Sequence, residues 1–161
     1  MKPFKINGKQ PIDPGILNLV VGLQAFDIPT QYSCEGHLNR KWSYPHVDIY
    51  ADNSHINFED FSKKMLAIKQ KWIKANIQIQ KKLIPLLEQF YKTRKTAYKY
   101  QITPHTFVGL CWVKLKCVGS DLLQIMPTKQ RKKELARYQK EMKDFGEFLL
   151  VQNEGSRRKR S

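Results

Sequence analysis

The sequence predicts a single α+β domain in which amphipathic helices cover a small mixed or antiparallel sheet. Two features lead to this fold class. Long segments carry apolar residues three and four positions apart, as helices with one buried face do, and short segments alternate apolar and polar residues, as half-buried strands do. The chain has 161 residues, 41% of them hydrophobic, which is sufficient for one ordinary core. We expect this domain over residues 1–154 and a disordered basic tail over residues 155–161.

The first helix is expected over residues 14–26. Asp13 precedes Pro14 as an N-cap acid, and proline is favoured at the first helical position. Pro29 ends the connection after this helix. A strand over residues 30–33 then leads into the turn that follows it.

A second strand is expected over residues 46–51. Its side chains alternate between two faces, with Val47, Ile49 and Ala51 on one face and His46, Asp48 and Tyr50 on the other. If the two strands pair, the polar set lies on the same side as the side chain that Cys34 presents.

Further helices and strands are expected after residue 51. An amphipathic helix follows with Ser54 or Asn57 as its cap, and Pro85 predicts that two helices meet there. Strands are expected over residues 98–102 and 106–118, separated by Pro104. Past Pro127, Thr128 is expected to cap a final helix. The apolar stripes and strand faces comprise Phe58, Phe61, Met65, Ile68, Trp72 and Ala75 in the first helix, Phe107, Cys111, Val113, Leu115 and Cys117 in the longer strand, and Leu135, Tyr138, Met142, Phe145 and Leu149 in the last helix.

Charge and cysteine content indicate the compartment and the partner. The chain has 29 Lys and Arg against 14 Asp and Glu, a net charge of +15, which favours a polyanionic partner. No apolar segment reaches the roughly 18–20 residues that a membrane span needs, and the N-terminus lacks a secretory signal pattern. Three cysteines without regular spacing fit reduced thiols. These features predict a cytoplasmic protein.

The turn Ser33-Cys34-Glu35-Gly36-His37 is the candidate reaction site. It places a thiol, a carboxylate and an imidazole around a glycine that permits a tight turn. Cys34 would be the nucleophile or a ligand, His37 or His46 the base, and Glu35 a proton carrier or hydrogen-bond acceptor. Asp48 would orient the base. Whether the chain is an enzyme stays open at this point.

Two other interpretations of the turn remain. Cys34-x-x-His37 has the spacing of half a zinc site, which His46, Asp48, Cys111 or Cys117 would complete, but the second close pair of a zinc motif is missing. We therefore assign no metal ligand and no cofactor from the sequence. Alternatively, Cys34 is a buried apolar residue and Gly36 only makes the turn. Cys111 and Cys117 lie on an apolar strand face and are expected in the core.

The first third of the chain resembles a known family. The order of Asp13, an amphipathic helix, Thr30 and then Ser-Cys-Glu-Gly-His is similar to the N-terminal part of the wybutosine-pathway tRNA methyltransferases, whose motif reads Ser-Cys-Ser-Gly-Arg. Small uncharacterised bacterial and phage proteins share Ser-Cys-Glu-Gly-His. Glu35 and His37 depart from the methyltransferase motif. The resemblance implies an α+β fold and an RNA-related substrate, and assigns no residue to S-adenosylmethionine.

A basic and aromatic segment is the candidate nucleic-acid contact. It interleaves cations with tyrosines, the combination that binds a phosphate backbone and stacks on exposed bases: Lys92, Arg94, Lys95, Tyr98 and Lys99. The sequence thus predicts a basic protein that binds nucleic acid, RNA in preference to DNA, and acts on it through the Cys/Glu/His turn. The alternatives are an enzyme for a small anionic substrate, dependent on Cys and His or on a metal, and a non-catalytic phage or effector protein that docks a partner.

Overall fold

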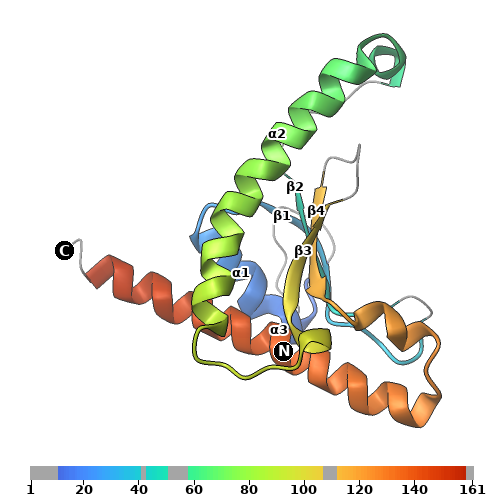
Figure 1. Cartoon of the computed structure of the whole chain (residues 1–161), viewed down its shortest axis with the longest axis vertical. Coiled ribbons are helices and arrows are strands. Elements are labelled where there is room, and N and C mark those ends of the chain that lie inside the picture. Colours follow the sequence, from blue (N-terminus) through green and yellow to red (C-terminus); the bar gives the residue numbers. More distant parts are fainter. Residues whose placement is uncertain (1–10, 41–42, 51–57, 107–111, 159–161) are drawn as a thin grey trace.

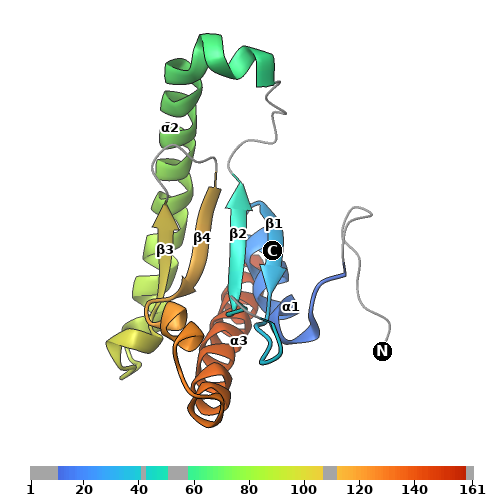
Figure 2. The ribbon, with the colours of Figure 1, turned by 90° about the vertical axis from the view of Figure 1, so that its right-hand side faces the viewer.

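The computed structural model describes residues 11–40, 43–50, 58–106 and 112–158, and it confirms the α+β fold. Within these residues, one four-stranded antiparallel sheet packs against three α-helices, which lie together on one of its faces (Figures 1 and 2). The helices are α1 (Leu17–Ala25), α2 (Phe58–Tyr91) and α3 (Thr128–Arg158), with short 3₁₀ turns at Pro14–Ile16, Tyr98–Tyr100 and Ser120–Gln124. The strands are β1 (Thr30–Cys34), β2 (His46–Tyr50), β3 (Ile102–Thr106) and β4 (Trp112–Cys117).

The strand order is β1-β2-β4-β3, and every neighbouring pair is antiparallel. Cys34 pairs with His46, and His46 pairs with Lys116. Directly opposed residues of an antiparallel pair point to the same face of the sheet. The side chains of Cys34, His46 and Lys116 therefore start from one face, as the alternation in residues 46–51 predicted for Cys34 and His46.

The core lies between the sheet and the helices. Val47, Ile49, Val113, Leu115 and Cys117 are completely buried on the helix-facing side of the sheet. The predicted stripe of α3 is buried against them, as are Leu19, Val20 and Leu23 of α1. Of the other predicted core residues, Trp72 is buried and Met65 is exposed, while Ala51, Phe107 and Cys111 lie outside the described residues.

Helix α1 packs closely on α3 because Gly146 faces it without a side chain. A Cβ at Gly146 would come within 2.8 Å of the Leu19 Cα, which is closer than carbon atoms approach in packed interiors. This close approach fixes α1 and the segment that precedes it relative to α3.

Pro85 does not divide the long helix, so the prediction of two helices is wrong. Helix α2 runs unbroken through Pro85, which is exposed, while Ile79, Leu83, Leu87 and Phe90 form a buried stripe on both sides of it. A proline inside a helix costs about 3 kcal/mol. Burial of several large apolar side chains, at about 1.5–3 kcal/mol each, offsets that cost and keeps the helix continuous.

Pro104 also lies inside an element, so the expected break between strands at this position is wrong. It belongs to β3, an edge strand, where a residue without an N–H group can be tolerated because one side of the strand has no ladder. Residues 98–100, expected to begin a strand, form a 3₁₀ turn instead. At the C-terminus, α3 continues to Arg158 and so enters the segment expected to be a disordered tail.

Candidate functional site

The conformation of the Cys34 turn depends on Gly36. Its φ is +83°, in the left-handed region that favours glycine, and a Cβ there would lie 2.8 Å from Leu135 Cδ1 and 2.9 Å from Pro45 Cδ. Gln139 of α3 supports the same turn, because its Nε2 donates to the carbonyl oxygens of Glu35 at 3.1 Å and of Gly36 at 3.2 Å. The turn is thus held on the surface of α3.

Three chemically reactive side chains converge at this turn. One donor atom each from Asp13, Cys34 and His37 lie within 4.8 Å of one another, and all three side chains are half-buried. His37 Nε2 lies 3.3 Å from Asp13 Oδ2. The structure therefore brings the predicted Cys34 and His37 together and adds Asp13. Within the described part of the chain, these three residues form a group that could hold a metal ion.

Asp13 plays a different part from the expected helix cap. Its side chain makes no capping hydrogen bond to the turn at Pro14–Ile16. Instead, Asp13 Oδ2 accepts the backbone N–H of Glu35 at 3.1 Å. The Glu35 carboxylate in turn accepts the Gly15 N–H at 2.8 Å. The observed role of Glu35 is that of hydrogen-bond acceptor, and this reciprocal pair fastens the segment before α1 to the Cys34 turn.

Ser43 joins the thiol to the histidine. Its Oγ accepts the backbone N–H of His37 at 2.7 Å and lies 3.5 Å from Cys34 Sγ. The sulfur also accepts the Gly36 N–H at 3.3 Å. With its oxygen accepting from His37, the Ser43 hydroxyl can direct its hydrogen to the sulfur.

His46 and Asp48 share the sheet face of Cys34 but have other partners. His46 Nδ1 is bonded to the Tyr44 carbonyl at 2.9 Å, and burial lowers the pKa of His46 below its ordinary value. Asp48 forms an ion pair with Lys114 at 2.8 Å. Among the ion pairs of the described residues, the carboxylate that pairs with a histidine is Asp13, and the histidine is His37.

The predicted nucleic-acid segment connects α2 to β3, and two of its cations bind acids of α3. Arg94 lies 3.0 Å from both Glu141 and Asp144, and Lys99 lies 3.0 Å from Glu134. Although burial opposes ionisation, hydrogen bonds from Lys140 and Arg94 hold the pKa of Asp144 below its usual value. Four residues of the predicted set are exposed, namely Lys92, Lys95, Tyr98 and Lys99, and the last of these is the one paired with Glu134.

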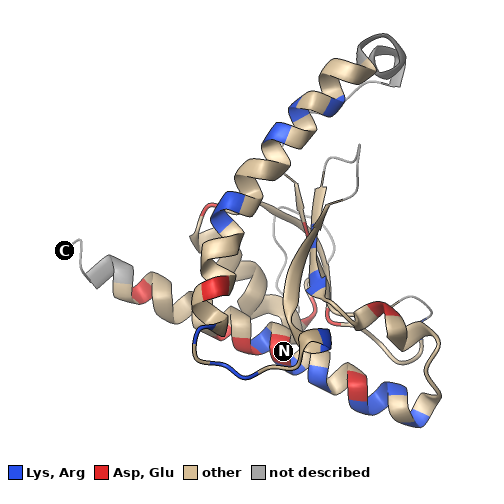
Figure 3. Cartoon of the chain, in the orientation of Figure 1, with Lys and Arg blue, Asp and Glu red and all other residues tan. Residues whose placement is uncertain are grey.

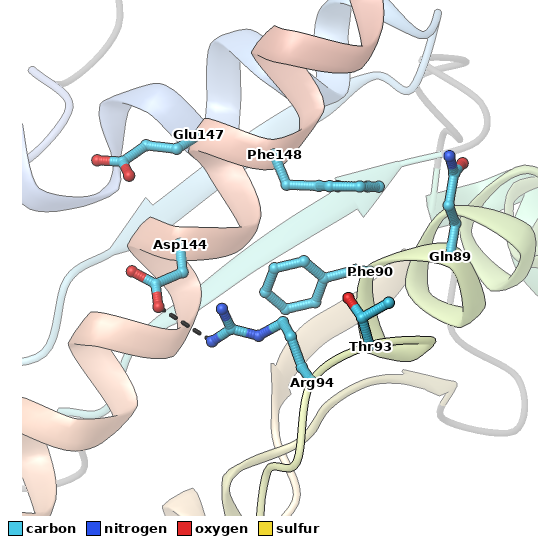
Figure 4. A pocket seen from close by; sticks show the side chains of 7 residues that line it. All are labelled: Gln89, Phe90, Thr93, Arg94, Asp144, Glu147 and Phe148. Carbon is cyan, nitrogen blue, oxygen red and sulfur yellow. Dashed lines mark hydrogen bonds and ion pairs between the residues drawn. The ribbon is translucent and has the colours of Figure 1, made fainter.

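An open hollow of about 470 Å³ lies beside Arg94, between α2 and α3 (Figure 4). The guanidinium of Arg94 sits 4.4 Å from the centre of the Phe90 ring and is paired with Asp144. Among the described residues that line the hollow, Arg94 is the only cation, and its charge is already neutralised there. The hollow is lined by Gln89, Phe90, Thr93, Arg94, Asp144, Glu147 and Phe148.

The sheet face opposite the helices, here called the open face, carries a row of aromatic rings. The ring centres of Tyr32 and Tyr50 lie 6.3 Å apart, and those of Tyr50 and Trp112 lie 5.7 Å apart in a stacked arrangement. The Tyr32 side chain is 52% exposed. Tyr32 lies two residues before Cys34 on β1, so the row and the thiol share this face. Strand alternation predicts the position of Tyr50, whereas the other two rings come from separate strands and were not predicted.

Free cations gather at the start of α3 (Figure 3). Lys129, Lys132 and Lys133 are exposed, and within the described part of the chain they have no acidic partner. The first turn of α3 contains no acid. Cations at a helix N-terminus are unfavourable because they meet the positive end of the helix dipole. This end of α3 is therefore strongly electropositive.

Comparisons with known proteins do not identify the chain: no family model, no curated protein and no solved structure matches it. None of the helices in the described residues combines the length and the apolar character that crossing a membrane requires.

Proposed function

We propose that this protein binds single-stranded RNA on the open face of its sheet and acts on it at the Cys34 turn. The observation that carries the proposal is the sharing of one face by the aromatic row and the thiol. Aromatic rings on a four-stranded sheet stack on unpaired bases, and such stacking does not depend on base identity. An RNA strand whose bases stack on Tyr32 would pass next to Cys34.

The phosphate contacts would come from the start of α3. Lys132, Leu135 and Gln139 are three and four residues apart, so they lie along one side of the helix. Leu135 and Gln139 both contact the Cys34 turn. At 1.5 Å per residue, Lys132 lies only about 10 Å along the helix axis from Gln139. Phosphates next to a nucleotide held at the turn would therefore reach a free cation.

RNA is favoured over duplex DNA for two reasons. The aromatic row is suited to unpaired bases, which RNA loops and ends present, whereas the bases of a duplex are already stacked. The resemblance of the Ser-Cys-Glu-Gly-His segment to the tRNA methyltransferase motif points to the same substrate class. The net charge of +15 supports binding of a polyanion in general and does not distinguish RNA from duplex DNA.

Fluorescence anisotropy with a labelled single-stranded RNA tests the proposed surface. Tyr32→Ala should weaken binding about 5- to 150-fold, which corresponds to about 1–3 kcal/mol for one stacked base. Tyr32→Phe should retain the affinity because it keeps the ring. Tyr98→Ala is the matched control, since Tyr98 is 73% exposed but lies in the segment between α2 and β3.

The two tyrosine variants separate the two candidate surfaces. Loss of binding in Tyr98→Ala with none in Tyr32→Ala would move the contact to the Lys92–Lys99 segment and refute the open face. No RNA affinity in the unmodified chain, combined with turnover of a small anionic substrate that depends on Cys34, would favour the enzyme alternative.

A further inference from the structure

We infer that Asp13, Cys34 and His37 form a binding site for one divalent cation of the zinc class, with a fourth coordination position open to solvent. This site goes beyond RNA binding and does not depend on it. The argument starts from the convergence of three donor types, sulfur, imidazole nitrogen and carboxylate oxygen, at the turn after β1.

The separations of the donor atoms fit a tetrahedral ion. Bond lengths of about 2.3 Å to sulfur and about 2.0–2.2 Å to nitrogen and oxygen place any two ligands about 3.3–3.6 Å apart. His37 Nε2 and Asp13 Oδ2 already lie 3.3 Å apart, and all three donors fall within 4.8 Å. To bring all three donor atoms to these separations around one ion, the side chains need to move by no more than about 1.5 Å.

The donor types select the metal. Thiolate and imidazole are soft or borderline ligands that suit Zn²⁺ and Co²⁺, whereas Mg²⁺ and Ca²⁺ prefer sites made only of oxygen. The site contains one carboxylate, from Asp13. It is therefore poorly suited to Mg²⁺, the ion that accompanies most phosphate chemistry.

The neighbours of the three ligands hold them in place. Asp13 Oδ2 accepts the Glu35 N–H at 3.1 Å, and Cys34 Sγ accepts the Gly36 N–H at 3.3 Å. Ser43 contacts the same sulfur and accepts the His37 N–H. Hydrogen bonds of this kind orient ligands and increase the affinity of metal sites.

Access to the site distinguishes it from a structural zinc site. The side chains of His37 and Asp13 are 29% and 32% exposed, respectively. Structural zinc sites use four protein ligands, while catalytic sites use three and leave one position to water or substrate. With three protein donors near the surface, the arrangement is of the catalytic type. A water molecule in the fourth coordination position would face the solvent beside the open face.

Titration of the chelator-treated full-length protein with Co²⁺ and with Zn²⁺ tests the site directly. We expect binding of one ion per chain, and for Co²⁺ a charge-transfer absorption band that requires a thiolate ligand. Cys34→Ser should abolish this band. Because loss of an outer-shell partner alone weakens metal sites 10- to 100-fold, His37→Gln should lower the affinity more than about 100-fold.

Matched variants guard against general effects on folding. His46→Gln changes a histidine on the paired strand and should leave Co²⁺ affinity unchanged, while Asp13→Asn keeps an acceptor for the Glu35 N–H and should still weaken binding. Circular dichroism checks that each variant folds. The inference is overturned if the folded protein binds no ion stoichiometrically, if the band survives in Cys34→Ser, or if His46→Gln weakens binding as much as His37→Gln. RNA affinity is measured separately, so failure of one proposal is distinguishable from failure of the other.

Discussion

Replacement of Gly36 by alanine should destabilise the protein strongly, because this residue has neither the backbone conformation nor the space that alanine needs. Its φ of +83° lies in the left-handed region. For a residue with a Cβ, that conformation costs roughly 1–2 kcal/mol. The new Cβ would also lie 2.8 Å from Leu135 Cδ1 and 2.9 Å from Pro45 Cδ. Overpacking of this kind costs typically about 1–3 kcal/mol, so the total is about 2–5 kcal/mol.

Urea denaturation of five proteins separates the two contributions: the unmodified chain, Gly36→Ala, Leu135→Ala, the double variant and Gly155→Ala. Gly36→Ala should lower the free energy of unfolding by about 2–5 kcal/mol relative to the unmodified chain. In a Leu135→Ala background the methyl group has more room, so the same substitution should cost only about 1–2 kcal/mol plus any remaining contact with Pro45. Gly155→Ala is the control: this glycine lies in α3, a Cβ there would meet nothing within 4 Å, and alanine should stabilise by up to about 1 kcal/mol. A loss below about 1 kcal/mol in Gly36→Ala would refute the argument that this turn requires glycine.

Three further predictions concern charge. If RNA binds through Lys132 and its neighbours, the affinity should fall at least about tenfold between low and physiological salt, and a flat response in the anisotropy titration would contradict phosphate contacts. Burial and the charge of Lys116 lower the pKa of His105, and Asp121 opposes them. As the pH falls below about 6.5, the unfolded chain therefore takes up the proton before the folded chain does, so stability should decline from there toward the lowered pKa. Thermal unfolding of His105→Gln should show a flatter decline over the same pH range. Arg94→Ala leaves the buried Glu141 without its cation and should destabilise by about 1–3 kcal/mol in urea, whereas the exposed Lys92→Ala should change stability by less than about 0.5 kcal/mol.

Local patterns were sufficient to predict which residues share the face of the sheet that carries the candidate site. The alternation of Val47 and Ile49 with His46 and Asp48 is a property of a single strand, and the short connection after Cys34 favours pairing with the next strand. The structure confirms this pairing, since Cys34 lies opposite His46. The turn at Gly36 was predictable because glycine favours a tight turn after a strand, whereas its contacts with Leu135 and Gln139 of α3 were not.

The partner of His37 was not predictable from such patterns. Asp13 is separated from the turn by all of α1, and Asp followed by Pro is a strong local signal for a helix start. The backbone does begin a 3₁₀ turn there, yet the side chain binds Glu35 and His37 instead of capping it. A sequence pattern can locate such an acid but cannot show that packing of α1 on α3 turns it toward residues far along the chain.

Prolines and cations were overestimated as local signals. Pro85 and Pro104 suggested breaks, but a buried stripe around one and an edge position for the other allow both elements to continue. Arg94 and Lys99 suggested a phosphate contact because cations and tyrosines alternate there. Their carboxylate partners, Glu141 and Glu134, come from a helix much later in the sequence, so only the tertiary structure shows that these charges are neutralised.

The position of Asp13 connects the metal site to the stability of the fold. Cys34 and His37 belong to one turn, whereas Asp13 precedes α1, so an ion held by all three would close a loop that contains α1 and β1. These ligands come together only in the folded chain, and a ligand specific to the folded state stabilises it by about 2.7 kcal/mol at a concentration 100 times its Kd. The reciprocal hydrogen bonds between Asp13 and Glu35 and between Glu35 and Gly15 already hold the same junction without an ion. The junction is therefore formed before an ion arrives, which lowers the ordering cost of binding one at these three half-buried side chains.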